Sequence, residues 1–160
     1  MTSANYLESV YTIRFSDCDP FKHLNNARYI DYFLNAREDH LRDHYQLDLA
    51  QEAMKGQAWV VKEHSISYVR PAVYNEIVSI STALIEVNAD NLLVEMVMFD
   101  APKRQLKALL HTRFVSINSL NGKRSPHSKE FMDFLSDKVA SVNADGFDID
   151  SRVQYWLNAN

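Results

Sequence analysis

One broad apolar helix followed by four successive strands is the pattern that most restricts the fold of this chain. Apolar side chains recur at helical spacing from Ala27 to Leu41, and neighbouring aromatic residues widen this face beyond that of a one-sided surface helix. Four segments rich in β-branched and aromatic residues follow, at 59–69, 76–87, 92–100 and 105–118. The turns between them are short, which favours antiparallel pairing. We therefore expect an α+β fold in which a five-stranded antiparallel sheet wraps around one long helix, with 11–15 as the first strand.

Shorter elements flank this central pattern. The long helix is expected to begin at Asn25 or Asn26, which can cap it, and to end at 44–47. Residues 48–56 are a polar connection, and a second helix is expected from Ser128 to about residue 140. A length of 160 residues favours one domain. We assign residues 1–142 to that domain and 143–160 to a polar C-terminal tail with an isolated aromatic patch at 155–157.

Composition excludes several classes of partner. The formal net charge is −4, and no basic cluster is large enough for a nucleic-acid footprint. No stretch approaches the roughly 20 apolar residues that span a bilayer, and the first ten residues lack an apolar signal core. Cys18 is the single cysteine, which excludes an intrachain disulfide and fits a reducing compartment. We expect a cytoplasmic protein with no nucleic-acid and no membrane partner.

The segment 14–29 carries the chemistry. It runs from a strand through Asp17 and Asp19 into the start of the long helix. An aspartate is ordinarily anionic at neutral pH, so Asp17 can attack a carbonyl or take a proton from water. The backbone N–H groups near His23 and Leu24 are expected to hold an oxyanion, because the helix begins there. Spacing alone leaves a turn or capping role for Asp17 as the alternative.

The neighbouring polar residues have weaker assignments. His23 can bond a substrate carbonyl or orient Asp17, and a simple loop histidine is equally compatible with the pattern. Asn25 either binds the attacking water or caps the helix. Asp19 is expected to hold the loop, and Cys18 to be a small packed residue. The spacing of the two aspartates and His23 fits no zinc pattern, so no metal is expected.

These motifs resemble the hot-dog-fold acyl-CoA thioesterases. The first part is similar to 4-hydroxybenzoyl-CoA thioesterase and the second to long-chain acyl-CoA thioesterases of the same superfamily. The segments that carry the resemblance are 15–20, 23–29, Tyr32-Phe33, Ala36-Arg37, 68–72 and the turn at 118–126. The chain departs from the benzoyl-type enzyme at 21–23, where Phe-Lys-His replaces small residues.

The resemblance implies a function and an assembly. It implies hydrolysis of an acyl-CoA to a free acid and CoA without a cofactor, with Asp17 at the position of the catalytic aspartate. It also implies a homodimer that can pair into a homotetramer, with active sites between subunits. Arg70, Lys123 and Arg124 are candidates for binding the CoA phosphates, because guanidinium and ammonium groups suit phosphate.

Two other functions compete with this interpretation. A non-catalytic hot-dog module would bind an acyl or CoA ligand without needing a carboxylate beside the helix start. A phosphatase of the haloacid dehalogenase type would use Asp17-Cys18-Asp19 as its Asp-x-Asp loop. That second fold needs strands that alternate with helices, and the uninterrupted strands from 58 to 118 argue against it.

Overall fold

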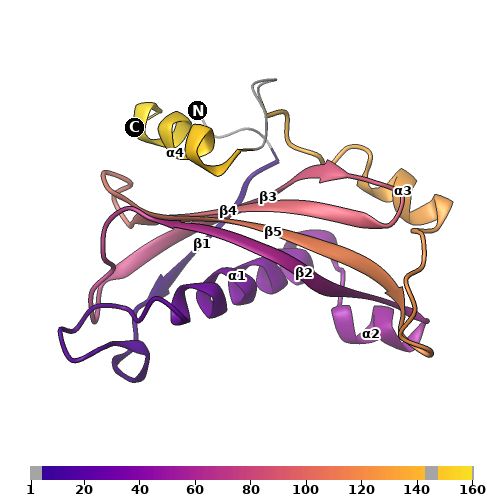
Figure 1. The fold of residues 1–160 in the computed structure, drawn as a ribbon, viewed down its shortest axis with the longest axis horizontal. Helices are drawn as coiled ribbons and strands as arrows, with labels where there is room; N and C mark the ends of the chain where they lie inside the picture. Colours follow the sequence, from indigo (N-terminus) through magenta and orange to yellow (C-terminus); the bar gives the residue numbers. More distant parts are fainter. Residues whose placement is uncertain (1–4, 143–147, 160) are drawn as a thin grey trace.

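An antiparallel sheet of five strands curves around helix α1 (Figure 1). The computed structural model describes residues 5–142 and 148–159. The elements in chain order are β1 Leu7–Thr12, the 3₁₀ helix η1 Phe15–Asp17, α1 Arg28–Tyr45, α2 Leu49–Met54, β2 Gln57–Tyr68, β3 Ile77–Val87, β4 Asn91–Asp100, β5 Leu106–Asn118, α3 Lys129–Leu135 and α4 Ile149–Asn158. The α+β architecture predicted from the sequence is therefore confirmed. None of the helices in the described ranges is long and apolar enough to cross a membrane.

The main core lies between α1 and the concave face of the sheet. Phe33 and Ala36 of α1 are fully buried, as are inward side chains of three strands: Ile80, Met96 and Leu110. Burying an apolar side chain contributes roughly 1.5–3 kcal/mol, so this layer supplies much of the stability. The apolar face of α1 is broad because the curved sheet contacts the helix on more than one side.

The strand order is β1-β3-β4-β5-β2, so β1 and β2 are the two edges of the sheet. Strand β1 has six residues and β2 has twelve. The longer edge exposes Val60 and Val61, at 46% and 42% of their surface. An exposed edge of this length is an available pairing surface.

Several boundaries differ from the sequence prediction, and one of them is the end of α3, which lies at Leu135 and not near residue 140. The first strand ends at Thr12, and residues 15–17 form a 3₁₀ turn instead of continuing it. The connection after α1 contains helix α2, which Asp48 caps through bonds from the N–H groups of Ala50 and Gln51. Helix α1 begins at Arg28 with Ala27 as its N-cap, and no side chain caps it. The expected capping by Asn25 or Asn26 is therefore wrong by one to two residues.

Helix α4 was not expected from the sequence and lies on the face of the sheet opposite α1 (Figure 1). Asp148 caps its first turn, and Val153 and Trp156 pack against apolar residues of β4 and β5. The expected tail therefore contains a helix at 149–158, while residues 143–147 and 160 lie outside the described residues. The sequence pattern that indicates this helix is the spacing of Ile149, Val153 and Trp156, which places them on one helical face.

A buried carboxylate fixes this outer layer. Glu95 of β4 is fully buried and accepts two bonds from Arg152 at 2.8 Å each. Trp156 Nε1 at 2.8 Å and the Tyr6 hydroxyl at 2.7 Å also donate to it, and His111 Nε2 lies 2.8 Å away. Burial alone would raise the pKa of Glu95, but the bonds from Arg152 and His111 bring it down to about 2. His111 therefore has a structural role in this network.

Candidate active site

The loop between η1 and α1 is a small hairpin joined to the segment after β2. Cys18 pairs with Leu24 in an antiparallel bridge, and His23 pairs with Val73. Lys22 at the tip adopts a left-handed backbone with a φ of 64°. Its carbonyl accepts the N–H of Tyr74 at 2.8 Å. The hairpin therefore holds the loop that carries Asp17 and Asp19 against the segment that follows β2.

Asp17 is half-buried on the β1 side of the hairpin. Its Oδ2 accepts the hydroxyl of Tyr32 at 2.7 Å, and that phenol oxygen accepts the N–H of Arg14 at 3.0 Å. Burial, followed by the bond to Asp17, raises the pKa of Tyr32 to about 12, so the phenol stays protonated and donates. Asp17 lines a cavity of about 780 Å³ whose other charged residues are Arg14, Asp31, Glu38 and Asp39. Four carboxylates and one guanidinium make this cavity acidic.

Asp19 lies on the hairpin itself. Its Oδ1 accepts the N–H groups of Phe21 at 2.8 Å and His23 at 3.1 Å. The role of holding the loop was expected for this residue, and these bonds supply it. Within the described structure no hydrogen bond reaches its Oδ2. The carboxylate is thus fixed through one oxygen, while the other has no protein partner.

Backbone donors in this region are almost all engaged. The His23 N–H bonds Asp19, and the Leu24 N–H donates to the carbonyl of Ala72 at 2.8 Å. Neither amide is available to an oxyanion in this arrangement, because the helix begins four residues after Leu24 and the hairpin uses both groups. Across residues 21–28 of the described structure, every backbone N–H donates a hydrogen bond except that of Asn26.

The remaining predicted residues of the loop have these positions. The side chain of His23 is exposed and makes no hydrogen bond to Asp17 in the described structure, where Tyr32 donates to that carboxylate. Asn25 Oδ1 accepts the N–H of Ala27 at 3.1 Å, which makes it a turn residue before the helix. Cys18 packs at the edge of the core, and burial followed by the two neighbouring aspartates raises the pKa of its thiol. A protonated thiol agrees with the packing role expected for it.

The three predicted phosphate-binding residues fall into two groups. Arg70 is exposed directly after β2, beside the hairpin. Lys123 and Arg124 are exposed in the turn after β5, next to the start of β2. Twelve residues of β2 separate the two groups, a length of roughly 35–40 Å at strand spacing. Arg124 also bonds Asp90 through Nε at 2.6 Å. One chain therefore does not bring all three residues together.

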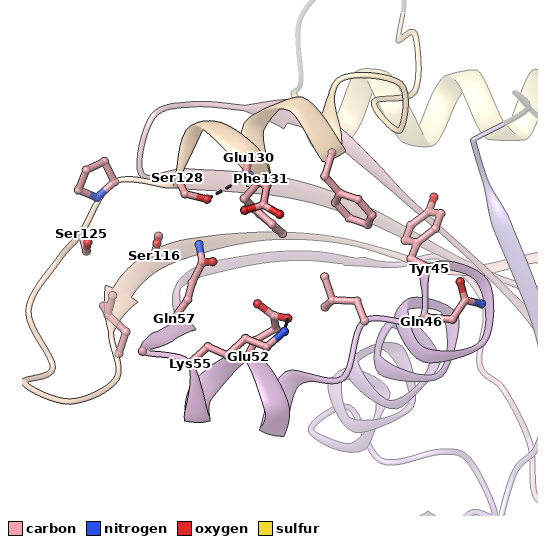
Figure 2. Close-up of a pocket in the computed structure, with 15 residues that line it drawn as sticks. Tyr45, Gln46, Glu52, Lys55, Gln57, Ser116, Ser125, Ser128, Glu130 and Phe131 are labelled. Atoms are coloured by element: carbon pink, nitrogen blue, oxygen red, sulfur yellow. Dashed lines mark hydrogen bonds and ion pairs between the residues drawn. The ribbon is translucent and has the colours of Figure 1, made fainter.

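Two adjoining cavities lie at the other end of α1, and sequence reasoning missed both. A cleft of about 560 Å³ runs between α2 and α3, with polar residues from both sides facing it (Figure 2). A narrower cavity of about 320 Å³ lies between α1, the sheet and α3 and is lined mostly by apolar side chains. The two share Tyr45, Leu47, Phe131 and Phe134. No single motif marks these walls, because they come from distant parts of the chain.

Comparisons with known proteins agree on one family. The chain matches the model of the thioesterase-like superfamily over residues 13–135. It is 30% identical over 114 residues to the long-chain acyl-CoA thioesterase FadM of Escherichia coli strain K12, covering 70% of this chain and 83% of that protein. Among solved structures, the probable thioesterase YbaW of Escherichia coli superposes with a TM-score of 0.72 at 28% identity, covering 83% of this chain and 98% of that chain.

A more distant structure shares the fold alone. The 1,4-dihydroxy-2-naphthoyl-CoA thioesterase Slr0204 of Synechocystis superposes with a TM-score of 0.74 at 17% identity. The alignment covers 82% of this chain and 96% of that chain. The hot-dog arrangement expected from the sequence is thus confirmed by both the sheet topology and these likenesses.

Proposed function

Because this chain belongs to the thioesterase-like superfamily and is a thioester hydrolase, we propose that it cleaves acyl-CoA thioesters to a free carboxylic acid and CoA. The observation that carries the proposal is one short loop that contains both a carboxylate fixed by two amides and a backbone N–H without an acceptor in the described structure. The similarity to FadM, a long-chain acyl-CoA thioesterase, supports acyl-CoA as the substrate class.

We assign the reacting carboxylate to Asp19 and keep Asp17 as the competing assignment. Asp19 has one oxygen fixed by two amides and one oxygen without a protein partner. It also lies on the hairpin that contacts the segment after β2. Asp17 is instead bound to Tyr32 and faces the acidic cavity, which would repel the phosphates of CoA. The family resemblance pointed to Asp17, because the sequence does not reveal which carboxylate oxygen is engaged.

The N–H of Asn26 is the donor that we assign to the developing oxyanion. It has no acceptor in the described structure, and its carbonyl is fixed by the Tyr68 hydroxyl at 2.7 Å. A preorganised donor of this kind contributes about 3–4 kcal/mol to transition-state stabilisation in other acyl-transfer enzymes. The carboxylate then either attacks the thioester carbonyl or takes a proton from the attacking water. In both cases the C–S bond breaks and CoA leaves as a thiolate, which needs no strong acid. After direct attack, water hydrolyses the anhydride between the acyl group and Asp19, which releases the free acid and restores the carboxylate.

A dimer through the β2 edge would complete the site. Two-fold antiparallel pairing of β2 with β2 of a second copy places the start of one strand beside the end of the other. The Lys123-Arg124 turn of one copy would then lie next to Arg70 and the hairpin of its partner. The exposed valines at 60 and 61 supply apolar surface for this pairing. This arrangement brings together the three basic residues that a single chain keeps apart.

The test of this function is thiol release from acyl-CoAs of short, long and aromatic acyl groups. Release of free CoA with a defined preference among the acyl groups supports the proposal. Binding of acyl-CoA without release from any member would favour a non-catalytic module instead. Magnesium-dependent release of inorganic phosphate, unaffected by CoA, would favour the phosphatase interpretation.

A further inference from the structure

The narrow cavity between α1, the sheet and α3 contains an unusual charge. Its walls are mostly apolar and include Leu34, Leu41, Trp59, Leu92, Phe114 and Phe131. Its volume of about 320 Å³ lies in the range of small-molecule sites. If a methylene takes about the 30 Å³ that a water molecule occupies in the liquid, the cavity holds roughly ten carbons. Arg37, on the inner side of α1, is one of the lining residues.

Arg37 is 92% buried, yet it has no carboxylate partner. Its side chain retains 8% of its accessible surface, and its one hydrogen bond in the described structure runs from Nη1 to the Thr82 hydroxyl at 3.2 Å. That hydroxyl is itself shared with Nδ1 of His40 at 2.7 Å. A guanidinium has five N–H donors, so most of its bonding capacity is unused. Burial lowers the pKa of Arg37 to about 10, which still leaves it charged at neutral pH.

The other deeply buried arginine of the described chain shows how the fold pairs such a charge. Arg152 retains 5% of its surface and makes two bonds to Glu95 and a third to Tyr6. Buried charges in proteins are ordinarily paired in this way, because an unpaired charge is costly to remove from water. In the described structure Arg37 lacks such a partner, although it lines a mostly apolar cavity, which indicates that the partner is a ligand.

A second cation borders the same space. Lys138 lines the cavity, with Nζ 4.0 Å from the centre of the Phe134 ring and bonded to Asp137 at 2.9 Å. Glu38 is the one acidic residue among those lining the cavity, and its exposed carboxylate lies 3.8 Å from Arg42. The charge facing the cavity is therefore mainly positive. An apolar wall with a buried cation suits an alkyl chain that ends in an anion.

We propose that Arg37 binds the carboxylate of a medium-chain alkyl ligand whose hydrocarbon fills this cavity. Two sources share this chemistry: a free fatty acid, which is the product of the reaction, and the terminal carboxylate of a dicarboxylic acyl-CoA substrate. The second source rests on the proposed acyl-CoA hydrolysis, whereas the first does not need turnover. Guanidinium binds carboxylate through two parallel N–H bonds, and Arg37 has the unused donors for this geometry.

Calorimetric titration with decanoate and 1-decanol tests the site directly. We expect wild type to bind decanoate at least tenfold more tightly than decanol, Arg37→Met to lose that preference, and Arg37→Lys to retain part of it. Equal affinities in the wild type, or a preference that survives in Arg37→Met, would overturn the proposal. Leu41→Trp should weaken binding of both ligands, because it fills the cavity, so unchanged binding would also contradict the assignment.

Thermal denaturation separates a ligand site from a structural arginine. Because Arg37 has one neutral partner, Arg37→Met should unfold at the same or a higher temperature than wild type. A markedly lower unfolding temperature would show that the charge stabilises the fold and would count against the site. The comparison of decanoate with decanol on wild type still decides the matter if a variant fails to fold.

Hydrolysis of decanoyl-CoA and decanedioyl-CoA distinguishes the two sources. A preference of at least tenfold in kcat/KM for decanedioyl-CoA, lost in Arg37→Met, assigns the carboxylate to the substrate. No such preference, together with Arg37-dependent decanoate binding, assigns it to the free acid. Decanoate binding without hydrolysis of either thioester would remove the proposed function and leave this site standing. Hydrolysis of both thioesters at equal rates, together with equal binding of decanoate and decanol, would support the proposed function and remove this site.

Discussion

The hydroxyl of Tyr32 donates a 2.7 Å hydrogen bond to Oδ2 of Asp17. The same phenol oxygen accepts the N–H of Arg14, so one side chain of α1 fixes both ends of the turn that precedes the hairpin. This contact positions the loop that contains Asp19. Tyr32 thus orients the Asp17 carboxylate, which was one of the roles considered for His23.

Tyr32→Phe should therefore loosen the loop without a large change in packing. We expect a loss of about 1–3 kcal/mol in the free energy of unfolding, because a carboxylate and a backbone N–H both lose a partner. The rate constant for hydrolysis should fall as well, as measured by thiol release. Tyr74→Phe is the matched control, because the Tyr74 ring packs against Phe15 and its hydroxyl makes no hydrogen bond in the described structure. Equal effects of the two substitutions would contradict a specific role for Tyr32.

The Glu95 network predicts a stability loss in strong acid. The folded pKa of Glu95 is lowered to about 2, below its unfolded value. Its contribution is thus complete above the unfolded pKa of about 4.3 and is lost as the pH falls towards 2, a total of roughly 3 kcal/mol. Urea denaturation at pH 6 and pH 3 should show roughly half of this loss in wild type, because pH 3 still lies above the folded pKa. Glu95→Gln should be less stable than wild type at pH 6, and its free energy of unfolding should fall less between pH 6 and pH 3. An equal fall in the two proteins would contradict this account.

His40 predicts a second loss at milder pH. Burial, followed by the charge of Arg37, lowers the pKa of His40 to about 4. The unfolded chain therefore binds a proton more readily between pH 6.5 and 4, and stability should decline as the pH falls through that window. His40→Gln should flatten this part of the stability curve. If the stability of the wild type instead increased as the pH fell from 6.5 to 4.5, the native His40 would be charged.

The exposed β2 edge predicts that assembly depends on two valines. Substituting Asp for Val60 and Val61 together should convert a dimer to an 18.5 kDa monomer and reduce turnover, because the site then lacks the partner's basic turn. Sedimentation velocity measures the mass, and thiol release measures the activity. Val10→Asp on the opposite edge is the control, since Val10 is also exposed. A wild-type protein that is fully active as a monomer would contradict an active site between two subunits.

Much of the fold could be predicted because its signals are local. The breadth of the apolar face on α1 and the strong strands at 76–87, 92–100 and 105–118 all appear in the structure within a few residues. Helix α4 was missed because it lies in a mostly polar C-terminal segment, although its apolar spacing was present. The order of the strands could not be obtained locally, because it depends on which strand edges meet in space.

The candidate site was predictable as a segment but not atom by atom. The sequence marked residues 14–29 as the place of chemistry, and in the structure they form η1, a short hairpin and the start of α1. It did not reveal that the amides of His23 and Leu24 are engaged, since those bonds involve Asp19 and the distant Ala72. The unpaired charge of Arg37 was equally hidden, because an arginine on a helix gives no indication of its partner.

The measurement that tests the central claim most directly is thiol release by wild type, Asp19→Asn and Asp17→Asn across the acyl-CoA panel. Asparagine preserves the acceptor that holds the hairpin amides, so the substitution at 19 removes charge with little change in the loop. We expect wild type to hydrolyse at least one acyl class, Asp19→Asn to lose at least a hundredfold in kcat, and Asp17→Asn to lose much less. Full activity in Asp19→Asn with loss in Asp17→Asn would contradict the assignment and return the reacting carboxylate to Asp17.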